Sequence, residues 1–150
     1  MPRSSSKPAT ASASDGLTPA QWARLHHLHF SSESLLLEAL THRSYANEDS
    51  EPVAYDNERL EFLGDAVLGP VSAELLFSRL PDAPEGELTM LRAALVRRDA
   101  LAELARGLRL GEALRMSAGE VKTGGRSRKN MLGDAFEAGI GAIYLDHGVV

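Results

Sequence analysis

The sequence predicts an all-α domain, and three observations lead to this prediction. Apolar residues recur at helical spacing over most of the chain. No segment shows the regular alternation of a strand, and no internal repeat is present. The chain has 150 residues, 43% of them hydrophobic, which is enough for one core in one domain. Residues 1–15 are rich in Ser, Ala, Thr and Pro and predict a disordered tail, so the folded domain is expected over residues 16–150.

Two short helices are expected first. Thr18 is a good N-cap and is followed by proline at the first helical position, which predicts a helix from Pro19 to about His27. Ser32 predicts the N-cap of a second helix, Glu33–Leu40. The polar stretch His42–Tyr55 then predicts a loop.

A long helix follows this loop. It is expected to begin after Asp56 or Asn57 and to end at about Leu80. Pro70 lies inside it and predicts a kink near Ala66–Gly69, because proline removes one hydrogen bond of the helix. The segment Leu80–Pro84 predicts a turn.

The second half of the chain also predicts helices. A helical region is expected from about Gly86 to Leu108, with a break near Arg98-Asp99. Met116–Ser127 is expected to be a connection, and the last helix is expected from about Arg128 to Leu145. The apolar end of the chain, Gly148–Val150, carries no stop signal and suggests a sequence that is cut short.

The composition excludes several kinds of site. The chain has no cysteine, which excludes disulfides, thiolate metal sites and cysteine catalysis, and which fits the cytoplasm as the expected location. No apolar run reaches the roughly 18 residues of a membrane span, so no membrane partner is expected. The formal net charge is -5, which by itself argues against nucleic acid, since its binders are usually basic.

Acidic residues share one face of the predicted long helix. Glu61 and Asp65 are four residues apart, so their side chains project in similar directions, and Glu58 joins the same face three residues before Glu61. Their neighbours are apolar, which predicts partial burial. Like charges at this spacing destabilise a helix, more so when partly buried, unless a cation or a proton neutralises them.

The last predicted helix repeats this pattern with Asp134 and Glu137. If the two helices pack with these faces together, four carboxylates converge. Oxygen ligands alone favour hard cations such as Mg²⁺ or Mn²⁺. Four acids without His or Cys are typical of a two-metal phosphodiester hydrolase. A single acid pair on a helix is more often a solvated face, and the spacing names no substrate.

The stretch Asn57–Leu68, NERLEFLGDAVL, resembles the signature of the ribonuclease III endonuclease domain. Four further segments resemble motifs of the same family: Ala39–Ala46, Glu85–Thr89, Gly119–Arg126 and Asp134–Asp146. The resemblance implies the helical fold of that domain. It also implies an endoribonuclease that cuts both strands of double-stranded RNA in rRNA and mRNA processing and leaves 5′-phosphate and 3′-hydroxyl ends. The implied enzyme is a Mg²⁺-dependent homodimer in which Mn²⁺ can substitute.

The resemblance also assigns roles to single residues. The four acids match the family's metal-binding and catalytic residues, and Asp65 and Glu137 match those usually named as the active site. Glu58 and Glu85 match acids with supporting roles around the cleavage site. Phe62 matches the aromatic residue that inserts into the partner subunit.

The sequence departs from the family pattern in three ways. Gly133 stands where alanine is more usual, and Pro70 is unusual just after the signature. Bacterial members usually carry a double-stranded RNA-binding domain after this one, so we expect the chain to be truncated at its C-terminus. The missing domain would supply basic surface, which accounts for the negative charge. A local basic cluster is expected to contact phosphates, the alternative being a solvated loop: Lys122, Arg126, Arg128 and Lys129.

Three functions follow as hypotheses. The first is an active endonuclease of double-stranded RNA. The second is another all-α metal phosphohydrolase acting on nucleotides, which shares the carboxylates but not the long motif. The third is a non-catalytic dimeric RNA-binding scaffold, which would be expected to have lost at least one of the acids, whereas all four are present.

Overall fold

The computed structural model describes residues 16–45 and 55–148. The predicted tail, most of the predicted loop and the last two residues lie outside the described residues. Within them every regular element is a helix, apart from an isolated parallel bridge between Thr41 and Arg115. This confirms the all-α prediction.

The first two helices begin where the sequence predicts them. They are α1 (Pro19–Leu25) and α2 (Glu33–Ala39). The hydroxyl of Thr18 accepts a hydrogen bond from the backbone of Gln21, whose side chain accepts one from the Thr18 backbone, so that a complete capping box starts α1.

The segment just before α2 is hydrogen-bonded to a distant part of the chain. Ser32 occupies the N-cap position, but its hydroxyl makes no capping hydrogen bond. Instead, the carboxylate of Asp146 accepts hydrogen bonds from the backbone N–H groups of Ser31 and Ser32, at 2.9 and 3.0 Å. These bonds anchor α2 to the C-terminal end of the last helix.

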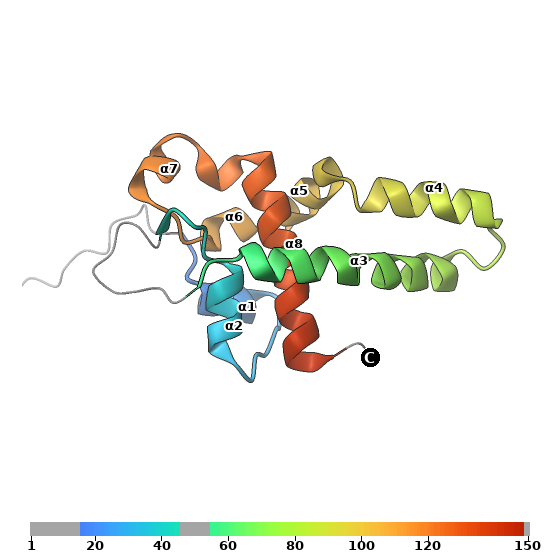
Figure 1. Ribbon diagram of the computed structural model, residues 1–150, viewed down its shortest axis with the longest axis horizontal. Coiled ribbons are helices and arrows are strands. Elements are labelled where there is room, and N and C mark those ends of the chain that lie inside the picture. The colour runs from blue at the N-terminus through green and yellow to red at the C-terminus, as the bar shows by residue number, and fades with distance from the viewer. Residues whose placement is uncertain (1–15, 46–54, 149–150) are drawn as a thin grey trace, which may run out of the picture.

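The next two helices, α3 (Glu58–Arg79) and α4 (Glu85–Leu95), form a hairpin whose far end extends away from the rest of the molecule (Figure 1). The helix α3 continues on both sides of Pro70 without a break, and the kink expected near Ala66–Gly69 stays a prediction. None of the residues of α4 is buried. The far part of the hairpin, residues 71–95, is called the arm below, and it exposes large apolar side chains: Val71, Leu75, Phe77, Leu80 and Met90.

The second half of the chain contains more helical turns than expected. After α5 (Arg98–Gly107) come three short elements, and α8 (Lys129–His147) ends the described chain. The short elements are α6 (Leu110–Ala113), α7 (Ala118–Lys122) and the 3₁₀ turn η2 (Gly125–Ser127). The expectation of a plain connection over Met116–Ser127 was therefore wrong, since elements of three to five residues are too short to show a periodic pattern. The break between α4 and α5 falls at Val96-Arg97, just before the predicted place.

The long helix α8 lies at the centre of the fold and contacts α2, α3, α5 and α6 (Figure 1). One core cluster surrounds its first half and includes Leu132, Ala135 and Trp22. Trp22 is buried in this cluster, and its indole donates a 2.8 Å hydrogen bond to the Leu108 carbonyl. A second, smaller cluster lies where α2, α3 and α8 meet: Ala39, Leu60, Ala138 and Ala142. Within the described residues, no helix combines the length and apolarity that a membrane span requires.

Candidate metal centre

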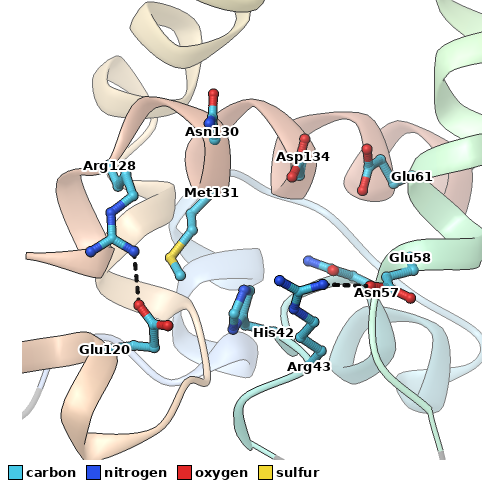
Figure 2. Close-up of a pocket in the computed structure, with 10 residues that line it drawn as sticks. All are labelled: His42, Arg43, Asn57, Glu58, Glu61, Glu120, Arg128, Asn130, Met131 and Asp134. Atoms are coloured by element: carbon cyan, nitrogen blue, oxygen red, sulfur yellow. Dashed lines mark hydrogen bonds and ion pairs between the residues drawn. The ribbon is translucent and has the colours of Figure 1, made fainter.

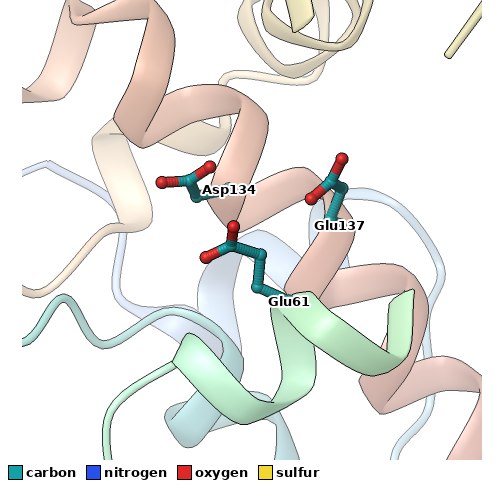
Figure 3. Close-up of side chains that lie close together, drawn as sticks. All are labelled: Glu61, Asp134 and Glu137. Carbon is teal, nitrogen blue, oxygen red and sulfur yellow. The ribbon is translucent and has the colours of Figure 1, made fainter. Parts of the chain in front are cut away.

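Three carboxylates meet where α3 crosses α8. Glu61 comes from α3, and Asp134 and Glu137 come from successive turns of α8 (Figure 3). One oxygen of each carboxylate lies within 4.8 Å of the oxygens of the other two. Glu61 and Glu137 are partly buried, as the apolar neighbours of both predicted. The predicted convergence of the two acidic helix faces is therefore present in the structure for these three residues.

The close approach of the two helices depends on glycines at their crossing. A Cβ atom at Gly64 would overlap the carbonyl oxygen of Glu137, and one at Gly141 would overlap the carbonyl oxygen of Leu60. Gly139 lies on the same helix as Gly141 but outside this contact, since a Cβ there would meet nothing within 4 Å.

The environment of this cluster opposes ionisation. Burial, and then the neighbouring charge of Asp134, raise the pKa of Glu61 to about 6. Burial, and then the charges of Asp65 and Glu61, raise the pKa of Glu137 to about 7. The cluster therefore holds more negative charge than the protein compensates, which favours binding of a cation or of a proton.

Asp65 is placed differently from the other three predicted acids. It lies one turn after Glu61 on α3, and its charge acts on Glu137. Its side chain is exposed, and it is not among the three carboxylates that lie within 4.8 Å of one another. Glu58 lies one turn before Glu61, where it forms a 3.6 Å ion pair with Arg43.

One basic residue at the cluster was not predicted. Arg98, the first residue of α5, donates a 2.5 Å hydrogen bond from its guanidinium to a carboxylate oxygen of Asp134. Its charge also lowers the pKa values of Glu61 and Glu137 relative to burial alone. No local pattern predicts this contact, because 36 residues separate Arg98 from Asp134.

A polar cleft of about 310 Å³ opens beside the cluster (Figure 2). Glu58, Glu61 and Asp134 line one part of it, and the other part carries basic and amide groups. Those groups come from the segment before α3 and from the start of α8: His42, Arg43, Asn57, Arg128 and Asn130. The cleft thus places positive charge next to the carboxylates.

His42 helps to order the wall of this cleft. Its Nδ1 atom lies 2.7 Å from the hydroxyl of Ser44, and that hydroxyl accepts a 2.9 Å hydrogen bond from the backbone of Ser117. Burial lowers the pKa of His42, which favours its neutral form. These contacts attach the segment before α3 to the start of α7.

The four basic residues that the sequence groups together have different contacts in the structure. Arg126 donates hydrogen bonds to the carbonyls of Gly111, Glu112 and Leu114, so it holds the chain around α6 in place. Arg128 lines the cleft and pairs with Glu120 at 2.8 Å (Figure 2). Lys122 is exposed at the end of α7. Lys129 is exposed at the start of α8 and pairs with Asp99 at 3.0 Å. Phosphate contacts by these side chains stay a prediction.

Glu85 and Phe62 do not belong to the group of three carboxylates. Glu85 begins α4 at the far end of the hairpin (Figure 1). Phe62 follows Glu61 on α3 and is 80% exposed. The roles given to both residues stay predictions.

The chemistry of the cluster fits a hard divalent cation. Its ligand atoms are all carboxylate oxygens, with no nitrogen or sulfur ligand among the grouped residues. Three carboxylate oxygens within reach of one ion are compatible with a site for Mg²⁺ or Mn²⁺. Glu61, Asp134 and Glu137 would hold the ion, with Asp65 beside them.

Comparison with known proteins places the chain in a family. A family model described as ribonuclease-III-like matches residues 32–150, which is most of the sequence. The chain belongs to the ribonuclease III family. Proteins named Ribonuclease 3 are similar in sequence: that of Symbiobacterium thermophilum is 58% identical over 120 residues, which are 80% of this chain and 50% of the relative. That of Ectopseudomonas mendocina is 54% identical over 120 residues, 80% of this chain and 49% of the relative. The chain therefore spans about half the length of these ribonuclease III relatives.

Solved structures of the ribonuclease III family share the fold. The nuclease domain of ribonuclease III from Campylobacter jejuni superimposes with a TM-score of 0.73 at 43% identity, covering 85% of each chain. That structure is described as showing flexibility in a region involved in dimer formation. Dicer from Pichia stipitis is a more distant likeness, with a TM-score of 0.53 at 25% identity over 79% of this chain and 47% of that one. The expected family and fold are thus confirmed.

Proposed function

We propose that the protein is an endoribonuclease that cuts double-stranded RNA by metal-assisted hydrolysis. The observation that carries the proposal is the convergence of Glu61, Asp134 and Glu137 at the crossing of α3 and α8, in a chain of the ribonuclease III family. Mg²⁺ is the proposed cofactor and Mn²⁺ a substitute. Asp65 and Glu137 are the proposed active-site pair, because they match the acids that the family resemblance names as the active site.

The proposed reaction adds water across one phosphodiester bond of each strand. The water oxygen joins the phosphorus, the bond from phosphorus to the 3′ oxygen breaks, and the 3′ oxygen takes a proton. The products carry a 5′-phosphate and a 3′-hydroxyl. A divalent cation supplies charge neutralisation and lowers the pKa of water when it is bound. The protein's contribution is to hold the carboxylates close together at a partly buried site, where a proton competes with the metal.

The cleft offers a binding place for the RNA backbone. Arg43 and Arg128 line it together with the carboxylates, and they pair with Glu58 and Glu120, respectively (Figure 2). Lys122 and Lys129 are exposed near the same end of α8 and extend the proposed contact with phosphates. Arg126 contributes by holding the loop that carries them.

A homodimer is part of this proposal. Phe62 exposes an aromatic ring beside Glu61, and a second subunit is the natural cover for it. Glu85 is too far from the cluster of its own subunit to support cleavage there, so its supporting role is proposed for the site of the partner. Glu58 supports the site of its own chain through Arg43. The proposed substrates are rRNA and mRNA precursors, and the proposed location is the cytoplasm.

The direct test is cleavage of a long double-stranded RNA by the purified chain at low salt, with and without Mg²⁺. We expect Mg²⁺-dependent cutting to short duplexes. Glu137→Gln should reduce the rate by roughly a hundredfold or more, because it removes a ligand whose ion supplies several kcal/mol to the transition state. Glu103→Gln is the matched control, since Glu103 is 72% exposed on α5 and pairs with Arg106 of the same helix. It should cut like the unchanged protein.

Other outcomes would contradict the proposal. Cutting that persists in Glu137→Gln would mean that the acid cluster is not the active site. No cutting by any variant, with dimers present in light scattering and RNA still bound, would favour the non-catalytic scaffold. Hydrolysis of nucleotides instead of RNA would favour a nucleotide phosphohydrolase. Low salt matters in each case, because weak phosphate contacts are lost first as salt rises.

A further inference from the structure

The charge of Arg98 is favourable beside the acid cluster and unfavourable at the start of its own helix. It is the first residue of α5, at the positive end of the helix dipole, where a basic side chain is unfavourable. Its guanidinium nevertheless reaches α8, where it contacts Asp134 at 2.5 Å and the carbonyl of Asn130 at 3.5 Å. The stability of α5 gives no reason for this position, whereas the negative charge of the cluster does.

The surface of α8 is shaped to admit this side chain. A Cβ atom at Gly133 would lie 3.3 Å from Cγ of Arg98, which is tighter than ordinary contact. The missing side chain at position 133 therefore leaves room for the stem of Arg98. Gly133 was a departure from the family pattern that the sequence could not explain, and this contact gives it a structural reason.

The side chain of Arg98 can also turn away from Asp134 toward solvent without separating α5 from α8. It is 46% exposed, and a second ion pair between the same two helices, Lys129 with Asp99 at 3.0 Å, does not involve the cluster. The helices thus stay linked if Arg98 turns toward solvent. Its ion pair with Asp134 is therefore not needed to join α5 to α8.

We propose that Arg98 is a resident counter-cation of the metal site. It neutralises Asp134 when no metal is bound and competes with a divalent cation for the negative charge of the cluster. It thereby lowers the affinity of the site for metal. This inference rests on the proposed function, because it assumes that Glu61, Asp134 and Glu137 bind a divalent cation. Arg98 is thus a positioning residue, because it acts on the metal site through its ion pair with Asp134.

The test is a direct measurement of Mn²⁺ affinity without RNA. Mn²⁺ is titrated into the purified chain at low salt, and the free ion is followed by its paramagnetic resonance signal. We expect Arg98→Met and Arg98→Gln to bind Mn²⁺ on the order of tenfold more tightly, because one positive charge a few ångströms from a divalent ion is removed. Arg98→Lys keeps the charge and should bind like the unchanged protein.

Two control variants separate this inference from its assumption. Arg106→Met removes the same charge from the same helix, but Arg106 pairs with Glu103 and the Ser127 carbonyl, so its Mn²⁺ affinity should not change. Glu137→Gln should weaken Mn²⁺ binding. If the unchanged protein binds Mn²⁺ and both neutral Arg98 variants bind it equally or more weakly, the counter-cation role is refuted and the metal site stands. If Mn²⁺ binding is absent, or is unaffected by Glu137→Gln, the metal site itself is refuted and the role of Arg98 falls with it.

Discussion

Glu137 has the more strongly raised pKa of the two affected acids in the cluster, and the reason is local. Its carboxylate is half-buried and faces the charges of Asp65 and Glu61, while the single guanidinium of Arg98 offsets only part of this repulsion. The folded protein therefore holds the proton of Glu137 at a pH at which an exposed glutamate has lost it. When Glu137 is ionised and no metal is bound, its charge therefore makes the folded state less stable.

The sign of the resulting pH dependence follows from linkage. The pKa of Glu137 is about 7 in the folded protein, against 4.5 for the ordinary side chain, so its favourable contribution is complete below pH 4.5 and is lost as the pH rises to about 7. We expect the metal-free protein to lose stability between these values. Glu137→Gln should lose less, by on the order of 1 kcal/mol after allowance for solvent screening of a half-exposed group.

Thermal melts of both proteins at pH 5 and pH 8 in a chelator check this prediction. Adding Mg²⁺ at pH 8 should raise the Tm of the unchanged protein more than that of Glu137→Gln, since the ion takes the place of the proton. Glu103→Gln serves again as the control. Identical pH profiles for Glu137→Gln and the unchanged protein would show that burial does not perturb this carboxyl.

At the scale of elements, the crossing of α3 and α8 decides whether a site exists. Gly64 and Gly141 lie in the contact, and each faces a backbone carbonyl of the other helix. Since Glu61 is on one helix and Asp134 and Glu137 are on the other, the distance between the helix axes sets the distance between the ligands. The close packing at Gly64 and Gly141 therefore determines whether the three carboxylates can bind one ion.

Gly64→Ala and Gly141→Ala test this dependence. Each added methyl group would overlap a backbone oxygen, which cannot move as a side chain can, so we expect a loss of about 1–3 kcal/mol or more in the free energy of unfolding. Mn²⁺ affinity should fall as well, because the carboxylates move apart. Denaturant unfolding and Mn²⁺ titration measure the two effects.

Gly139→Ala provides the matched comparison on the same helix. A methyl group there meets nothing within 4 Å, so the substitution should stabilise α8 by roughly 0.5–1 kcal/mol through helix propensity alone. It should leave Mn²⁺ affinity unchanged. Equal effects of alanine at positions 139 and 141 would contradict the role given to the crossing.

At the scale of the whole molecule, the apolar side chains that α3 and the arm leave exposed indicate an interface. Phe62 and Phe77 are 80% and 75% exposed, and Met90 on α4 is 75% exposed. Large apolar side chains gathered on one hairpin are unusual on the surface of a monomer. A second copy that covers this surface would also bring Glu85 of one subunit toward the other subunit, as the proposed homodimer requires.

Phe62→Asp should therefore convert dimers to monomers. Because the side chain is already exposed, the fold of the subunit should be unaffected, and the dimer dissociation constant should rise by roughly thirtyfold or more. Sedimentation at several concentrations measures it. Val121→Asp, at an exposed apolar residue of α7, is the control and should remain dimeric. A Phe62→Asp variant that dimerises normally would place the interface elsewhere.

Much of this description could be predicted from the sequence. Helix starts at Pro19, Glu33 and Glu58 were predicted to within a residue, because caps and apolar spacing are local signals. The candidate acids also came from local signals, as charged residues set in apolar runs at helical spacing. The short helices α6 and α7 were missed, since a single turn held by tertiary contacts has no periodicity of its own.

By itself the sequence determined that the chain is helical, which residues carry the acids, and through its long motif which family it resembles. Only the tertiary structure decided which acids meet, that Asp65 lies beside the group of three, and that Arg98 reaches Asp134. The physical reason is that these facts depend on how closely α3 crosses α8 and on where α5 begins against α8. Such distances come from packing between segments far apart in the chain, whereas a pattern within one helix specifies only its own faces.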